Sequence, residues 1–429
     1  MRHGRAAAGI AALIVTGLLA PALPAQAEPT TSPGGAAGGW LSRQLVGGDH
    51  LETTFDGVAY PDHGLTADAV LAFAAAGVGR DSGARATAWL AKPENLPQYL
   101  GDGTTESYAG AHAKVALLAQ VQGVDPAAFG GVDLITRLLA RQAPSGRFSD
   151  QSQFGDFSNG ITQSLAVIAL ERHGSAPQAA VDYLVGQACA GGGFPQKLEQ
   201  ATCEPDVDTT GYAVQALLAA GKSTEAGKAL DWLTSAQDAN GGFADLSPAP
   251  KPNANSTGLA AQALRVGGRA AAADKAVAFL TGLQVACSGV EANRGAIAYD
   301  STGFDASTAT RATAQAVLGV AGVGLTTLKT SDNADAPTLK CDAQPPTTTT
   351  GPTTTTTTST TAPTTTSNAS TPAATAPTTT TSPAAVVVTG RQTVALANTG
   401  ANIAPVLAIG ALMLVSGALA LVVSRRRTR

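Results

Sequence analysis

Residues 205–221 have the sequence PDVDTTGYAVQALLAAG, and residues 252–268 repeat the pattern without a gap as PNANSTGLAAQALRVGG. Residues 61–77 follow it too, and looser copies span 107–123, 158–174 and 306–322. In the clearest copies Asp or Asn comes before an alanine-rich apolar run and glycine follows it, as at the start and end of a helix. The pattern predicts six largely buried helices, one of them from about Ser256 to Val266.

A second signature lies before each of these helices, an aromatic residue followed by leucine. It recurs every 46 to 49 residues, at Trp40, Trp89, Tyr183, Trp232 and Phe279, with Arg137 in the one missing place. Ten residues beyond each leucine comes another apolar residue, often in a glycine-rich loop, and these are Leu51, Leu100, Phe148, Phe194, Phe243 and Val290. This half of each unit predicts an outer helix, for example from about Thr224 to Gln237.

Six helical hairpins in a row predict an all-α repeat domain over residues 28–344. Such a row forms either an open solenoid or a closed ring. Closure removes exposed ends, so we expect an (α/α)6 toroid with the alanine-rich helices inside.

These repeats resemble the prenyltransferase and squalene-oxidase repeat superfamily, which has the α/α-toroid fold. The pattern aromatic-Leu-x-x-x-Gln-x-x-x-Gly-x-aromatic is similar to its QW repeat, with Phe where Trp is usual, and the resemblance covers about residues 40–325. The superfamily includes cyclases, protein prenyltransferases, cobalamin carriers and thioester-domain proteins. The resemblance therefore implies a fold more than an activity.

The segment Asp206-Val-Asp208 resembles the Asp-x-Asp-Asp acid motif of class II terpene cyclases. In such a cyclase a carboxylic acid protonates an alkene or epoxide, which would make Asp208 the acid and Asp206 its partner. Thr209 stands where the last aspartate of the motif belongs, which removes part of that arrangement.

A structural interpretation of the same segment is that it caps a helix. The equivalent positions are Asp62 and Gly64 in the first repeat and Asn253 and Asn255 in the fifth. Asp and Asn both accept hydrogen bonds from the free amides of a helix N-terminus, and we favour this interpretation.

Other enzyme motifs are absent from the sequence. It contains no zinc-binding Asp-x-Cys with a later His of the prenyltransferase kind, no thioester motif, no Gly-x-Ser-x-Gly and no phosphate loop. The question of enzyme activity stays open, and the pattern leans toward none. No cofactor is predicted, and cobalamin enters only by analogy of fold, through residues 207–213.

The ring geometry predicts where a ligand would bind. All inner helices of a toroid point the same way, so six N-termini meet at one mouth, where helix dipoles and unpaired amides favour a polar or anionic ligand. The loops carrying Phe148, Phe194 and Phe243 should rim that face. The candidate ligand residues are Asp62, His63, Asp206, Asp208, Asn253, Asn255 and Arg311.

Four cysteines lie within the predicted exported part, and an even count outside the cell suggests disulfides. Three pairings are possible, and we favour Cys189 with Cys203 and Cys287 with Cys341. A zinc site is the alternative, but no Cys-x-x-Cys spacing supports it.

Both ends of the chain predict export. Residues 1–27 have the basic start, apolar stretch and Ala-Gln-Ala site of a signal peptide, with a single membrane anchor as the alternative. Residues 345–395 are dominated at first by Thr, Pro, Ser and Ala, which predicts a disordered linker that could span on the order of 150 Å of cell wall.

Residues 396–429 contain Leu396-Ala-Asn-Thr-Gly400, an apolar run over about 403–423 and an arginine-rich end. This order resembles a sortase sorting signal of the Leu-Ala-x-Thr-Gly kind found in high-GC Gram-positive bacteria. It implies a partner sortase, cleavage between Thr399 and Gly400, and an amide link from Thr399 to peptidoglycan. The apolar run is long enough for a transmembrane helix before cleavage, and a simple tail anchor is the alternative.

The composition narrows the choice of function. Charged residues make up 14% of the chain, the net charge is −4 and no basic patch occurs, so nucleic acid is not an expected partner. We favour a secreted, wall-anchored protein that displays a binding or interaction domain for an unknown ligand. The alternatives are an extracellular cyclase or prenyltransferase-like enzyme with Asp208 as acid, and a structural wall protein without ligand.

Overall fold

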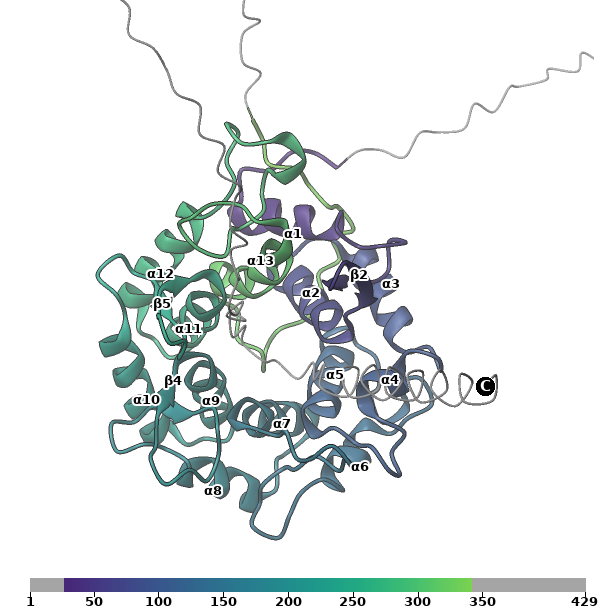
Figure 1. Ribbon diagram of the computed structural model, residues 1–429, viewed down its shortest axis with the longest axis vertical. Helices are drawn as coiled ribbons and strands as arrows, with labels where there is room; N and C mark the ends of the chain where they lie inside the picture. The colour runs from purple at the N-terminus through teal and green to yellow at the C-terminus, as the bar shows by residue number, and fades with distance from the viewer. Residues whose placement is uncertain (1–26, 342–429) are drawn as a thin grey trace, which may run out of the picture.

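The computed structural model describes residues 27–341, which form one closed ring of helices (Figure 1). The predicted signal peptide, linker and sorting signal lie outside these residues. Within residues 27–341, no helix is both long enough and apolar enough to span a membrane.

Six inner helices surround the axis of the ring, and each contacts the next, with the last one returning to the first (Figure 1). They are α2 (His63–Ala76), α5 (Ala109–Val121), α7 (Gly160–His173), α9 (Val207–Ala219), α11 (Ala254–Val266) and α13 (Ala306–Ala321). The predicted all-α toroid is confirmed, and the second helix of each repeat is the inner one.

Six outer helices cover the inner ring. They are α1 (Pro33–Ser42), α3 (Arg80–Leu90), α6 (Leu134–Leu139), α8 (Gln178–Gly186), α10 (Ser223–Ala236) and α12 (Ala270–Gly282). Most bury only one side, whereas the inner helices are buried on nearly all sides, as their alanine-rich sequences require. The predicted bounds of α10 and α11 differ from the observed ones by one or two residues.

Small residues let the inner helices approach closely. At the contact between α11 and α13, a Cβ added to Gly319 would lie 2.5 Å from the Gly258 carbonyl oxygen. A side chain at either position would push the two helices apart, so glycine is needed where α11 and α13 pack together.

Shorter elements fill the connections between outer and inner helices. Ahead of α2 lies the antiparallel hairpin of β1 (Glu52–Phe55) and β2 (Val58–Pro61). A pair of two-residue strands precedes α9 and consists of β3 (Phe194–Pro195) and β4 (Pro205–Asp206). A second such pair precedes α11 and consists of β5 (Phe243–Ala244) and β6 (Pro252–Asn253). Short helices α4 (Leu96–Leu100), η1 (Pro126–Ala128) and η2 (Glu291–Asn293) complete the described elements.

The tail that follows α13, residues 322–341, crosses the end of the ring at which the inner helices finish, and we call it the strap (Figure 1). Gln215 accepts the Leu325 N–H at 2.8 Å, Gln262 donates to the Val323 carbonyl at 2.6 Å, and Arg172 donates to the Leu325 carbonyl at 2.7 Å. Leu325 and Leu328 are fully buried. The strap therefore forms the floor of the ring, a feature that the repeats do not predict.

Both predicted disulfides are present, Cys189–Cys203 and Cys287–Cys341. The second joins the end of the strap to the loop after α12, as expected for a bond that ties the last segment to the last repeat. Because all four cysteines are bonded to each other in pairs, none is available as a zinc ligand.

Candidate functional site

A recurring hydrogen bond sets the register of the inner helices. The backbone N–H of a buried loop residue donates to a side-chain oxygen on the inner helix at 2.8 to 3.0 Å, in the pairs Leu51–Thr66, Phe148–Gln163, Phe194–Thr210, Phe243–Thr257 and Ile297–Thr313. Two corrections follow. Ile297, not the exposed Val290, is the sixth member of the loop series, and the last repeat is shifted by two residues from the sequence alignment.

These five bonds, together with the sequence alignment for α5, identify which side chains face the axis of the ring. The bonded side chains point outward to the loops, and residues two positions away lie about 200° around an α-helix. Two layers therefore face inward. The mouth layer, nearer the helix N-termini, is Gly64, Gly110, Ile161, Asp208, Asn255 and Arg311. The layer one turn below it is Asp68, Lys114, Leu165, Tyr212, Leu259 and Gln315.

One side of these layers is ionic. Lys114 Nζ lies 2.7 Å from Asp68 Oδ1, and Arg311 lies 2.7 Å from Asp62 Oδ2 and 3.9 Å from Asp68 Oδ2. Lys114 and Asp68 are almost completely buried. Two cations thus face two carboxylates, which is how buried charge is normally tolerated.

The opposite side, formed by residues of α9, α11 and α13, is polar, and several of its buried atoms have no hydrogen-bond partner among the described residues. Asp208 Oδ1 and both amide atoms of Asn255 and Gln315 are buried without a hydrogen-bond partner among the described residues. Burial and the neighbouring Asp206 raise the pKa of Asp208 well above its ordinary value. The shift favours the neutral carboxylic acid, the form in which Asp208 can donate a hydrogen bond.

The predicted helix caps are confirmed at three positions. Asp206 Oδ1 accepts the Thr209 N–H at 2.8 Å, Asp62 accepts that of Leu65 at 2.8 Å, and Asn253 accepts that of Ser256 at 2.9 Å. Asp208 and Asn255 are not caps, so capping explains only half of each motif. The caps also occupy amides that were expected to attract an anion.

Other predicted mouth residues lie elsewhere. His63 faces outward, with its ring 4.8 Å from that of Trp89, and burial lowers its pKa to about 4. Phe148, Phe194 and Phe243 are fully buried between the helices and do not form an exposed rim. Arg311 does reach the mouth layer, where it is paired with Asp62.

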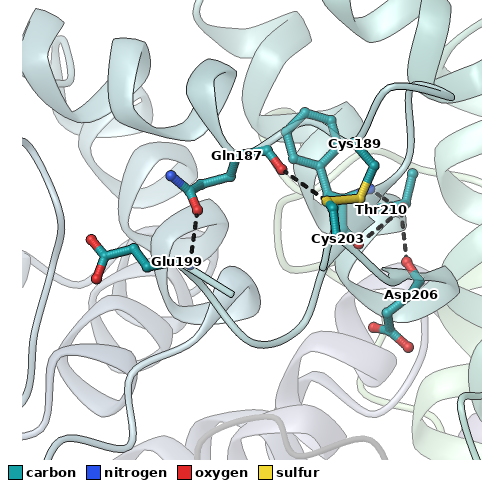
Figure 2. The surroundings of a disulfide bond; sticks show 7 residues. Gln187, Cys189, Glu199, Cys203, Asp206 and Thr210 are labelled. Carbon is teal, nitrogen blue, oxygen red and sulfur yellow. Dashed lines mark hydrogen bonds between the residues drawn. A yellow bond between two sulfur atoms is a disulfide. The ribbon is translucent and has the colours of Figure 1, made fainter. Parts of the chain in front are cut away.

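The Cys189–Cys203 disulfide holds the loop that leads into α9 (Figure 2). Directly after this loop, the Thr210 hydroxyl donates to the Asp206 carbonyl at 2.6 Å and accepts the Phe194 N–H at 2.8 Å. The first turn of α9, which carries Asp208, is therefore fixed from two directions. Within residues 27–341, no group of three or more His, Cys, Asp or Glu side chains is placed to hold a metal ion.

Comparisons with known proteins bear on the fold. No protein-family model matches the chain, and neither does any curated protein. A type II terpene cyclase from Scytonema has a similar structure, with a TM-score of 0.51 and 14% identity over 67% of this chain and 96% of that one. A protein from Actinoplanes gives a TM-score of 0.50 and 16% identity over 68% of this chain and 99% of that one.

An ent-copalyl diphosphate synthase from Streptomyces platensis aligns more loosely, with a TM-score of 0.41 and 17% identity over 61% of this chain. The alignment spans only half of that longer protein. At these identities the likeness concerns fold alone, and this chain has the terpenoid cyclase-like α/α-toroid fold.

Proposed function

We propose that this protein is a cell-surface binding module whose ligand enters the mouth of the ring and contacts α9, α11 and α13. The observation that carries the proposal is the Asn255 amide, which is buried beside Asp208 with neither of its polar atoms bonded. An unpaired buried polar group costs roughly 1–3 kcal/mol. A ligand that bonds to these groups would recover that free energy.

The remaining hydrogen-bonding capacity indicates the kind of ligand. The charges on the ionic side already pair with each other, and the atoms without partners on the other side belong to two amides and to the Asp208 carboxyl, whose pKa is raised toward the neutral form. We therefore expect a neutral group that both donates and accepts hydrogen bonds, such as an amide or adjacent hydroxyls, in place of the anion suggested by the sequence.

Display on the cell wall belongs to the same proposal. It rests on the sequence of the two ends of the chain, with sortase as the processing partner and Thr399 as the residue that is linked to peptidoglycan. Mass spectrometry of wall fragments released from cells would detect Thr399 joined to a peptidoglycan peptide. Release of the intact C-terminus with the membrane fraction would contradict it.

Titration of the full-length protein tests the binding site. Peptidoglycan stem peptides that carry no sugar, cobalamin and geranylgeranyl diphosphate are the probes, and calorimetry is the measurement. We expect the double variant Asp208→Ala/Asn255→Ala to lose at least tenfold in affinity for whichever probe binds. Gln120→Ala is the control, because that half-buried amide lies toward the other end of α5. Binding that survives in the double variant would rule out the mouth, and the absence of binding to all three would favour the purely structural alternative.

Acid catalysis is a second candidate, and the raised pKa of Asp208 is the observation that favours it. The shift favours the neutral acid, the form that can donate a proton to an alkene, and Asp208 Oδ1 has no hydrogen-bond partner among the described residues. A variant of the Scytonema cyclase was solved with geranylgeranyl dihydroxybenzoate as substrate. Against this candidate, Tyr212 is the one aromatic side chain in the two inward layers.

Product analysis after incubation with squalene or geranylgeranyl diphosphate separates the two candidates. If the protein is a cyclase, Asp208→Asn abolishes product while substrate still binds. If it is a binding module, no product forms with either chain.

A further inference from the structure

A second candidate site lies outside the axis of the ring, between the loops that precede α7 and α9. A cavity of about 330 Å³ opens there. Its lining includes Arg147, Asp156, Phe157, Asn159, Gln196 and Lys197. None of these residues belongs to the mouth layer, so the cavity is independent of the proposed mouth site.

Both walls of this cavity are held in place. Arg147 joins them, with Nη2 2.9 Å from Asp156 Oδ2 in one loop and Nη1 2.7 Å from Glu199 Oε2 in the other. Tyr183 also donates to Glu199, and the Glu199 N–H donates to Gln187 Oε1 at 3.3 Å. The Cys189–Cys203 bond closes the second loop beside Gln187 and Glu199 (Figure 2).

Glu199 itself has a strained backbone, with φ at 59° in the left-handed region that non-glycine residues rarely adopt. Such a conformation persists only where the surrounding contacts enforce it, and it is concentrated at functional sites. Here the disulfide, Tyr183 and Arg147 together enforce it. The result is a preformed wall, which lowers the entropy cost of binding.

The chemistry left available in the cavity is specific. The two terminal nitrogens of Arg147 are already bonded to Asp156 and Glu199, and its buried Nε has no partner among the described residues. The Lys197 ammonium and the Gln196 amide likewise bond to no described side chain. Phe157 presents a ring that is 37% exposed.

We propose that this cavity binds a saccharide unit that carries a carboxylate. The Phe157 ring would pack against the C–H face of the sugar, and the Gln196 amide and Arg147 Nε would bond to its hydroxyl or amide groups. Lys197, the cation without a carboxylate partner, would pair with the sugar's carboxylate.

Two sugars that differ in a single carboxylate test this assignment. N-acetylmuramic acid is N-acetylglucosamine with an added lactyl ether, and that ether supplies the carboxylate. Each is titrated into the full-length protein, and binding is followed by calorimetry and by tryptophan fluorescence. We expect N-acetylmuramic acid to bind about fivefold more tightly than N-acetylglucosamine, the effect of one partly exposed ion pair.

Variants separate the contributions. Lys197→Gln should reduce the affinity for N-acetylmuramic acid to that for N-acetylglucosamine, and Phe157→Ala should weaken both. Lys251→Gln, at an exposed lysine in the loop before α11, is the matched control and should change neither. Unchanged near-ultraviolet circular dichroism establishes that each variant is folded.

Three outcomes would overturn the proposal. They are no binding of either sugar at a sugar concentration 20-fold above about 1 mM, equal affinity for both sugars, or full affinity in both Lys197→Gln and Phe157→Ala. The Asp208→Ala/Asn255→Ala variant should retain N-acetylmuramic acid binding. The proposal for this cavity can therefore fail or hold independently of the proposal for the mouth.

Discussion

The mouth and the floor of the ring are built from the same six helices, but the buried polar side chains of α9 and α11 are satisfied differently at the two ends. At the floor, Gln215 and Gln262 bond to each other and to the backbone of the strap. At the mouth and one turn below it, Asp208, Asn255 and Gln315 keep buried atoms without partners. The protein chain thus closes one end of the ring with its own backbone and leaves buried polar atoms without hydrogen bonds at the other.

This difference is the basis for the proposed binding site at one end of the ring. Buried polar groups that stabilise a fold have their hydrogen bonds made within the chain, whereas buried groups left without partners lower stability. Gln215 and Asn255 are both buried amides facing inward from neighbouring helices, so they provide a direct test of this distinction.

The largest loss of stability is expected when the disulfides that hold the strap and the loop before α9 are removed. The Cys287–Cys341 bond closes 54 residues and Cys189–Cys203 closes 14. Replacing each pair with serine should lower the free energy of unfolding by about 4 and about 3 kcal/mol respectively. Denaturant unfolding of the two variants measures this, and a greater loss for the shorter loop would show that the strap is not held chiefly by its disulfide.

Gln215→Leu breaks the floor. The Leu325 N–H and the Gln262 side chain would both lose a buried partner, so we expect a loss of about 2 kcal/mol in unfolding free energy. Gln178→Leu, at an exposed amide on α8, is the control and should change stability little. A neutral result for Gln215→Leu would mean that water replaces these bonds and that the floor is not sealed.

The pH dependence of stability reports on Asp208. Its pKa is raised in the folded state, so its contribution is fully present below the unfolded pKa of about 4 and is lost as the pH rises toward the folded pKa. Wild type should therefore lose stability relative to Asp208→Asn above pH 4, at no more than about 1.4 kcal/mol per pH unit. Thermal unfolding between pH 4 and 8 measures the difference.

Asp305 provides the control for this titration. Its bonds to Ser307 lower its pKa, so Asp305→Asn should cost stability above the unfolded pKa, with the opposite sign. Parallel pH profiles for wild type and Asp208→Asn would mean that Asp208 is ionised, and the donor role would fail.

Asn255→Leu is expected to have the smallest effect and the opposite sign to Gln215→Leu. Replacing an unpartnered buried amide by an apolar group of similar size should leave stability unchanged or raise it by about 1 kcal/mol. Binding at the mouth should be lost at the same time. A loss comparable to that of Gln215→Leu in denaturant unfolding would erase the distinction between the two ends.

Much of the fold follows from local sequence. The Asp, Asn and Gly signals predict the inner helices to within a few residues, and capping by Asp62, Asp206 and Asn253 follows from residue type alone. Both disulfides were predicted, because cysteines close in sequence or at the end of the domain had few plausible partners. Where the physics is local, the pattern is sufficient.

The features that were missed depend on distant contacts. The strap has no repeat or periodicity, and only its bonds to Gln215, Gln262 and Arg172 give it a place. The loop after α12 is longer than in the other repeats, so a count of ten residues from Leu280 reaches Val290 and not Ile297. The different roles of Asp206 and Asp208 were also missed. The two residues are of one type and are separated by one position, but on a helix such positions lie on nearly opposite sides, so one caps α9 and the other faces the axis.

The Cys287–Cys341 bond has a consequence for mechanics. A pull applied to the chain beyond residue 341 reaches Cys341 first, and the covalent bridge passes the load directly to the loop after α12. The hydrogen bonds from the strap to Gln215, Gln262 and Arg172 then carry only part of the tension. A protein held by its C-terminal end under flow would therefore keep its floor closed, and the geometry of its mouth would be insulated from the tether.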